Sequence, residues 1–243
     1  MQAFRYILVV LLSVMLLLSC AKRSRQSRYD RRTQSSVIEK SHEGTFMPKA
    51  DIKKNRGEKL DGPTIFRKYD SAVFMIFTTN GTQSYQGSGF FINDHGLAVS
   101  NYHVFKDTYM GYEQIKLVGS DVAYKVKRVI AKSEEHDFIL FEVNCDDNNY
   151  INIADKQPSV GEKVYAIGSP RGLENTFSSG EISQWRSKYI IQTNVMIDHG
   201  SSGGPLINEY GNVVGITSGT FADGSQANLN YAWSIDVIKG YLR

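Results

Sequence analysis

The chain has 243 residues, a formal net charge of +3 and two cysteines. This length suits one ordinary domain or two closely packed halves, and two cysteines are too few for a disulfide framework. The histidines and cysteines show no C-x-x-C or H-x-x-x-H spacing, so we expect no metal and no cofactor.

The N-terminus has the pattern of an export signal. Arg5 precedes thirteen uncharged residues, Tyr6–Leu18. This run is shorter than the roughly 20 apolar residues of a membrane span but fits the apolar core of a secretory signal. It ends in LLSC, which resembles a bacterial lipobox, where cleavage precedes a lipidated cysteine. We therefore predict a lipoprotein-type signal peptide over 1–20 with Cys20 as the lipid attachment site; an ordinary signal peptide or an uncleaved anchor is the alternative.

That prediction implies a cell-envelope lipoprotein exported in a bacterium and facing the periplasm. It would leave Cys145 as the only free thiol, so no intramolecular disulfide can form even in an oxidising compartment. Cys145 lies in the polar stretch NCDDNN, and we interpret it as a bystander.

Charge divides the rest of the chain. Residues 21–62 carry twelve Lys/Arg against six Asp/Glu, whereas residues 63–243 carry fifteen against nineteen. The first segment has few apolar residues and no sustained period, so we predict a disordered basic tether. Its basic cluster over 22–32 would lie beside the membrane, where attraction to anionic headgroups is one interpretation and a solvated linker the other. The negative remainder lacks a basic stripe, so nucleic acid is not an expected partner.

From residue 63 onward the pattern is one of short strands and glycine-rich turns. Apolar or alternating runs such as VFMIFT, FILFEV and VYAIG are separated by Gly, Asn, Asp and Ser. This spacing predicts an all-β sandwich or barrel. A half-buried strand is expected over Val122–Lys127, and a short C-terminal helix over Ile235–Leu242 with Ile235, Ile238, Tyr241 and Leu242 on one face. The polar stretch 144–149 divides the region into halves of about 63–145 and 150–235.

The stretch DHGSSGGPLIN, residues 198–208, has the composition of a nucleophile loop. A serine hydroxyl needs a base to activate it and backbone N–H donors to stabilise the oxyanion, and small residues allow the tight turn that supplies such donors. Gly200–Gly204 also fits G-x-S-x-G, the nucleophile elbow of α/β-hydrolases, in which the histidine follows the serine. The histidines of this chain are His42, His95, His103, His136 and His199. All five precede Ser202, which excludes the hydrolase interpretation and leaves the order His, Asp, Ser.

Two upstream residues are candidate partners of that serine. His103 follows the predicted strand LAVS, and Asp137 opens the buried run DFILFEV, where an orienting carboxylate would lie. His42 lies in the tether and His95 in a turn. His199, three residues before Ser202, has no obvious orienting acid.

Five blocks in order resemble the protease domain of trypsin-like serine peptidases of the HtrA/Deg type. They are GSGFFINDHGLAVSNYHVF, HDFILFEV, GEKVYAIGSPRGLENTFSSGEIS, IQTNVMIDHGSSGGPLIN and GNVVGITSG. The resemblance covers about 65–236 and implies two six-stranded antiparallel β-barrels of chymotrypsin type, with the active site in the cleft between them. It implies His103 as base, Asp137 as orienting acid and Ser202 as nucleophile, with the amides of Gly200 and Ser202 as the oxyanion hole.

The sequence departs from this family at several positions. Chymotrypsin-like zymogens carry an aspartate before the nucleophile, which pairs with a newly cut N-terminus; Ser201 stands there, so we expect no such activation. HtrA-type sequences usually have Asn directly before the nucleophile and Pro three residues before it, where this chain has Ser201 and His199. Met196 falls at the base of the specificity pocket and favours small or medium apolar residues over Arg or Lys before the cleaved bond.

The resemblance also bears on domains and partners. The chain stops shortly after the protease-like pattern, so we expect no PDZ domain, and the homotrimer common in the family is an unsupported possibility. The main hypothesis is a membrane-tethered serine endopeptidase whose polypeptide substrates are exported or misfolded proteins, cleaved through an acyl-enzyme intermediate. The alternative is a protease-fold binding or chaperone-like lipoprotein with an unproductive site.

Overall fold

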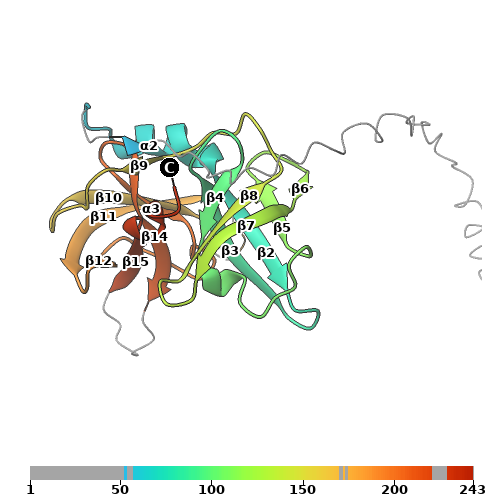
Figure 1. Cartoon of the computed structure of the whole chain (residues 1–243). Coiled ribbons are helices and arrows are strands. Elements are labelled where there is room, and N and C mark those ends of the chain that lie inside the picture. The colour runs from blue at the N-terminus through green and yellow to red at the C-terminus, as the bar shows by residue number, and fades with distance from the viewer. Residues whose placement is uncertain (1–51, 54–56, 170–171, 173–174, 221–228, 243) are drawn as a thin grey trace, which may run out of the picture. The chain divides into compact units, whose positions relative to one another are not determined.

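The computed structural model describes residues 52–53, 57–169, 172, 175–220 and 229–242. These residues form two β-sheets that lie side by side (Figure 1). Strands of the first sheet come from the N-terminal part of this region, and those of the second come from the C-terminal part together with one short strand at the start. The predicted all-β architecture with two packed halves is confirmed.

The first sheet contains, within the described residues, the strands β2 (Val73–Thr79), β3 (Ser84–Phe91), β4 (Leu97–Ser100), β5 (Gln114–Leu117), β6 (Ala123–Tyr124), β7 (Val126–Ser133) and β8 (Phe138–Val143). Their order is β6-β5-β2-β3-β4-β8-β7, and every pairing is antiparallel. The sheet is open, since β6 and β7 at its edges pair with one described neighbour each. This half therefore differs from the closed six-stranded barrel that the resemblance implies.

The edge strands of the first sheet are short or irregular. The run Val122–Lys127, predicted as one strand, is divided at Lys125: it contains all of β6 and the start of β7. β6 is only two residues long, and register shifts on either side of Arg128 and Val129 interrupt the pairing of β7 with β8. Bulges of this kind bend a strand and increase its local twist.

The second sheet contains, in the part of the chain that the structure describes, the strands β1 (Ile52–Lys53), β9 (Asn152–Ala154), β10 (Lys163–Gly168), β11 (Thr176–Trp185), β12 (Ile190–Thr193), β13 (Pro205–Asn208), β14 (Asn212–Thr220) and β15 (Asn230–Ser234). Six of them close a barrel in the order β14-β13-β10-β11-β12-β15, because β15 pairs back with β14. β9 and β1 extend the sheet beyond β14 through parallel pairings. This half is the closed six-stranded barrel that was predicted.

One hydrophobic core joins the two sheets. Its largest cluster combines fully buried side chains of the first sheet with others of the second: Phe90, Val99, Leu140, Ile167, Ile207 and Ile216. Each sheet also packs around a further cluster of its own. Burial stabilises by about 25 cal/mol for each Å² of apolar surface, so separating the sheets would be unfavourable. The shared cluster thus holds one sheet against the other.

A helix that the sequence analysis missed begins the domain. Helix α2 (Gly62–Tyr69) starts at Asp61, whose carboxylate accepts a hydrogen bond from the Thr64 amide at 2.9 Å. Pro63 is the second residue of the helix, where its fixed φ suits a first helical turn. Ile65 and Tyr69 are buried in the shared core. The stretch DGPT carries this N-cap signal and could have predicted the helix. A single 3₁₀ turn, η1 (Asp70–Ala72), leads from α2 into β2.

The end of the predicted tether is also structured. β1 pairs in parallel with β9, and the Leu60 amide donates a hydrogen bond to the Glu209 carbonyl at 2.7 Å. The prediction that residues 21–62 are disordered throughout is therefore wrong for β1 and for the residues that lead into α2. Both contacts use main-chain groups, and two-residue pairing leaves no hydrophobic period in a sequence.

The C-terminal helix is shorter than predicted. Helix α3 comprises only Asp236–Lys239. Ile235, Ile238 and Leu242 are buried as expected, whereas Tyr241 is 43% exposed. The apolar segment Tyr6–Leu18 and Cys20 lie outside the described residues. None of the helices that the structure describes is long and apolar enough to cross a membrane.

A cross-strand ion pair between β7 and β8 provides a test of the first sheet. Arg128 donates to both carboxylate oxygens of Glu142, at 2.6 and 2.9 Å. These hydrogen bonds, and to a lesser degree the charge of Arg128, hold the pKa of Glu142 below its ordinary value of 4.5, against the effect of partial burial. A carboxylate with a lowered pKa stabilises the fold above its unfolded-state pKa, and this contribution is lost as pH falls through the folded-state pKa.

We therefore expect Glu142→Gln to lower the free energy of unfolding at neutral pH and to have progressively less effect as pH falls below 4.5. Denaturant unfolding of the wild type and the variant over this pH range measures the difference. A difference that stays constant with pH would contradict the role given to the pair.

Candidate active site

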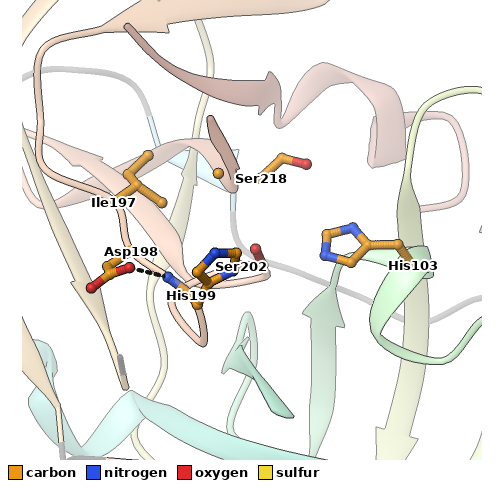
Figure 2. Close-up of a pocket in the computed structure, with 7 residues that line it drawn as sticks. His103, Ile197, Asp198, His199, Ser202 and Ser218 are labelled. Atoms are coloured by element: carbon orange, nitrogen blue, oxygen red, sulfur yellow. Dashed lines mark hydrogen bonds between the residues drawn. The ribbon is translucent and has the colours of Figure 1, made fainter. Parts of the chain in front are cut away.

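The three residues predicted to act together are brought into one region by both sheets. His103 lies in the single 3₁₀ turn η2 (Tyr102–Val104) after β4, and Asp137 directly precedes β8. Ser202 lies in the loop between β12 and β13 of the second sheet. In Figure 2 the His103 imidazole extends from one side toward Ser202 and Ser218. His103 and Ser202 line the same cavity of about 220 Å³.

Asp137 holds His103 at two points. Its Oδ2 lies 2.8 Å from His103 Nδ1, and its Oδ1 accepts a hydrogen bond from the His103 amide at 2.9 Å. An ionised carboxylate can only accept, so the ring nitrogen facing it carries the proton. The other ring nitrogen, Nε2, is then an acceptor, as a general base requires.

The backbone of Asp137 is itself fixed in an uncommon conformation. Its φ is 44°, in the left-handed region that Asp and Asn adopt more readily than most residues. The side-chain amide of Asn101 donates a hydrogen bond to the Asp137 carbonyl at 2.8 Å. The side chain of Asp137 is only 16% exposed, whereas that of His103 is 45% exposed. The acid is thus enclosed and the imidazole is accessible.

Ser218 is a site residue that the sequence analysis did not single out. It lies in β14, and its hydroxyl donates a hydrogen bond to Asp137 Oδ2 at 2.8 Å. The same carboxylate oxygen therefore faces both His103 and Ser218, and the second sheet takes part in orienting the acid of the first. The sequence signal was a serine directly after the apolar run VVGIT, in a block already assigned to the resemblance.

The hydroxyl of Ser202 makes no hydrogen bond within the part of the chain that the structure describes. Ser202 lines the cavity together with His103. Its hydroxyl can therefore react without first breaking a hydrogen bond to another described side chain. Hydrogen bonds between catalytic groups are often long without substrate and tighten in the substrate complex.

The loop before Ser202 forms a tight turn. The Ser201 amide donates a hydrogen bond to the Asp198 carbonyl at 2.9 Å, with His199 and Gly200 at the turn's centre. Gly200 has φ of 96°, so glycine is required at this corner. Gly203 has φ of 91°, and a Cβ there would lie 2.2 Å from the Ser88 carbonyl oxygen. The glycine content seen in the sequence thus serves both the turn and the close approach of β3.

Some backbone amides of this loop donate hydrogen bonds within the protein and others do not. The Gly203 amide donates to the Thr217 carbonyl at 2.7 Å, and the Gly204 amide donates to the Ser201 carbonyl at 3.0 Å. The amides of Gly200 and Ser202 donate to no acceptor among the described residues. These are the two donors expected to form the oxyanion hole, and Ser202 itself lines the cavity.

The structure differs from the sequence expectation for the specificity pocket. Met196 is 75% exposed and does not line the cavity that holds Ser202; it lines a second cavity of about 130 Å³ together with Ser201. The apolar side chain in the first cavity is that of Ile197, its neighbour. Burial alternates along this segment, since Val195 and Ile197 are buried on either side of the exposed Met196.

His199 lines the cavity beside Ser202 and is exposed (Figure 2). Its amide donates to its neighbour Asp198 Oδ1 at 2.7 Å. Cys145, the predicted bystander, is not among the residues that line this cavity, and burial raises its pKa to about 11. Its thiol is therefore protonated near neutral pH and a poor nucleophile. Within the described residues no group of three or more His, Cys, Asp or Glu side chains is placed to hold a metal ion.

The chain order of His103, Asp137 and Ser202 and their arrangement in space are those of a trypsin-like peptidase domain. The chain matches the family described as trypsin-like peptidase domain over residues 87–216, a span that contains His103, Asp137 and Ser202. This span is more than half of the chain, and the chain belongs to that family.

Particular relatives narrow the comparison. The chain is 36% identical over 184 residues to "Probable periplasmic serine endoprotease DegP-like" of Hahella chejuensis, covering 72% of this chain and 38% of the relative. It is 28% identical over 169 residues to "Protease Do-like 1, chloroplastic" of Arabidopsis thaliana, covering 63% of this chain and 38% of that protein. The predicted relation to HtrA/Deg-type proteases is confirmed, although the chain spans well under half the length of these relatives.

The fold is similar to that of the serine endoprotease from Yersinia pestis. The TM-score is 0.67 at 22% sequence identity, and the match covers 76% of this chain and 66% of that chain. At this identity the likeness concerns the fold alone, and it supports the chymotrypsin-like arrangement of the two sheets.

The contacts of Asp137 predict a graded series of variants. We expect Asp137→Asn to slow the reaction of Ser202 with a fluorophosphonate by about 10⁴-fold, because the amide would favour the wrong imidazole tautomer. Ser218→Ala keeps the carboxylate and both of its contacts with His103. We expect it to slow the reaction by only about 10- to 100-fold, the value of one hydrogen bond to a charged group. Labelling reactions quenched at successive times measure the rate for each variant. A Ser218→Ala variant that reacts at the wild-type rate would show that this hydroxyl does not orient the acid.

Proposed function

We propose that this chain is a serine endopeptidase of the DegP/HtrA type, with Ser202 as nucleophile, His103 as general base and Asp137 as orienting acid. The observation that carries the proposal is one cavity lined by the Asp-bound His103 imidazole and by Ser202, whose loop holds two backbone amides without an acceptor among the described residues. The family match and the curated relatives support the same activity.

Each step of peptide hydrolysis has a group in this site. Ser202 Oγ attacks the carbonyl carbon while His103 Nε2 takes its proton, and Asp137 stabilises the resulting imidazolium. The Gly200 and Ser202 amides donate to the negative oxygen of the tetrahedral intermediate. His103 then gives its proton to the leaving amine as the C–N bond breaks. Water, deprotonated by His103, hydrolyses the acyl-enzyme and regenerates the Ser202 hydroxyl.

The cavity suggests the kind of side chain accepted before the cleaved bond. Its volume is about 220 Å³, and Ile197 supplies its apolar side chain. We propose that it takes small or medium apolar residues. Substrates with such residues at the cleaved bond expose them when unfolded, which fits exported or misfolded proteins as the substrate class.

Location is proposed from the N-terminal sequence. We propose that Cys20 carries lipid and tethers the chain to a membrane of the bacterial cell envelope, facing the periplasm. The LLSC lipobox after an apolar run supports this, and one relative is described as periplasmic. We expect the wild type to incorporate radiolabelled palmitate and Cys20→Ser, expressed in the same bacterium, to incorporate none. Equal incorporation in both proteins would contradict the anchor.

A fluorophosphonate probe tests the enzymatic function directly. We expect full-length wild type to be labelled and to cleave casein, whereas Ser202→Ala does neither, because the attacking oxygen is absent. Ser201→Ala is the matched control: it removes the neighbouring hydroxyl, which no reaction step uses, and should retain labelling and cleavage. Labelling that persists in Ser202→Ala would contradict the assigned nucleophile. A folded wild type that neither labels nor cleaves would favour the alternative of a protease-fold binding protein.

A further inference from the structure

The oxyanion loop needs a support other than the ion pair used by zymogen-type relatives. The residue before the nucleophile is Ser201, whose side chain carries no charge. Its hydroxyl cannot pair with a chain terminus as an aspartate does. A loop that must keep two amides unpaired and directed at a reacting oxygen still has to be held in place, because such donors stabilise the transition state through preorganisation.

Ser88, in β3 of the first sheet, contacts this loop on both sides of the nucleophile. Its hydroxyl donates a hydrogen bond to the Gly200 carbonyl at 2.7 Å, and its amide donates to the Ser202 carbonyl at 2.8 Å. Ser88 is fully buried, so water does not compete for either contact. One residue of the first sheet therefore binds the two residues of the second sheet whose amides form the proposed oxyanion hole.

The direction of the Ser88 hydroxyl is fixed by a third contact. The Ser169 amide donates to Ser88 Oγ at 3.0 Å. A backbone N–H can only donate, so Ser88 Oγ is the acceptor there and its single proton remains for the Gly200 carbonyl. The Ser88 carbonyl in turn accepts from the Ser100 hydroxyl at 2.7 Å. Ser88 therefore has every polar group bonded and little freedom to move.

Loss of the Ser88 hydroxyl would leave two buried backbone groups unpaired, the Ser169 amide and the Gly200 carbonyl. An unpaired buried polar group is unfavourable, so the loop would shift toward another partner. Displacements of about 1 Å at a catalytic group reduce rates by about 10²-fold. The site is sensitive to this shift because the Gly200 amide belongs to the residue whose carbonyl would be released.

We infer that Ser88 is a positioning residue that holds the oxyanion loop in its donating conformation through the Gly200 and Ser202 carbonyls, in place of a charged pair. This inference rests on the proposed function. It assigns to Ser88 no contact with substrate: the residue acts only through the loop, from the opposite sheet.

Fluorophosphonate kinetics separate positioning from a structural role. With Ser88→Ala in the full-length chain, we expect the limiting labelling rate to fall by about 10²-fold, with the concentration of probe for half-maximal rate unchanged. The labelled fraction at completion should still reach that of the wild type. The pH profile of labelling should keep its midpoint, because the base His103 and its acid are untouched. A protein that is merely destabilised would show the reverse, a lower final fraction reacting at the wild-type rate.

Thr193→Val is the matched control. Thr193 is also fully buried, and its hydroxyl donates to the Glu181 carbonyl at 2.7 Å while accepting from the Val195 amide at 3.2 Å. Thr193→Val therefore removes one donated and one accepted hydrogen bond, as Ser88→Ala does, but within the second sheet. We expect it to label at the wild-type rate. An equal slowing of labelling in both variants would overturn the inference.

The remaining outcomes are also decisive. If the wild type is not labelled, the proposed function fails and this inference fails with it. If the wild type is labelled and Ser88→Ala reacts at the same rate, only the inference fails. Should Ser88→Ala not fold, Ser88→Cys keeps the shape of the side chain with a much weaker donor, and the same slowing is expected. A Ser88→Cys variant that reacts at the wild-type rate would overturn the inference.

Discussion

The hydrophobic core shared by the two sheets is the constraint on which the rest of the structure depends. His103 and Asp137 come from the first sheet, and Ser202 and Ser218 come from the second. Neither sheet alone contains all the groups proposed as nucleophile, base and oxyanion donors. The buried cluster that joins β3, β4 and β8 to β10, β13 and β14 therefore sets the distance between the reacting groups.

Hydrogen bonds between the two sheets fix the positions of the site residues more closely than the hydrophobic core does. The Ser218 hydroxyl reaches from β14 to Asp137, and Ser88 reaches from β3 to the loop that carries Ser202. Thr217 adds a contact from within the second sheet, since its hydroxyl donates to the Ser201 carbonyl at 2.8 Å. These contacts of the loop are hydrogen bonds from neutral donors, and salt screens interactions between exposed charges far more than it affects such buried bonds. The position of the loop should thus depend little on ionic strength.

The grouping of His103, Asp137 and Ser202 could be predicted from the sequence, because a histidine, an aspartate and a glycine-flanked serine in this order leave few arrangements open. The residues that support them could not. Ser88 and Ser218 are ordinary serines in strands, and only the pairing of distant strands shows what their hydroxyls bond. Ile197 and not Met196 lines the cavity of Ser202, because the direction of each side chain in this loop depends on a backbone path that the sequence does not display. The same limit applies to the open first sheet, whose edges are set by strand pairing, and to β1, whose two residues pair through the main chain. Helix α2 is different, because Asp61 and Pro63 form a recognisable helix N-cap pattern in the sequence.

The division of the site between two sheets has a consequence for populations of molecules. A chain in which the sheets have come apart, or in which either one has lost its strands, loses the arrangement proposed to activate Ser202 and to bind an oxyanion. It would expose extended apolar segments such as VFMIFT and become a potential substrate. Under the proposed endopeptidase activity, self-digestion would require an encounter between one intact molecule and one unfolded molecule, and its rate would rise with the product of their two concentrations. A dilute preparation would then be spared, whereas molecules held at high local concentration would degrade unfolded copies.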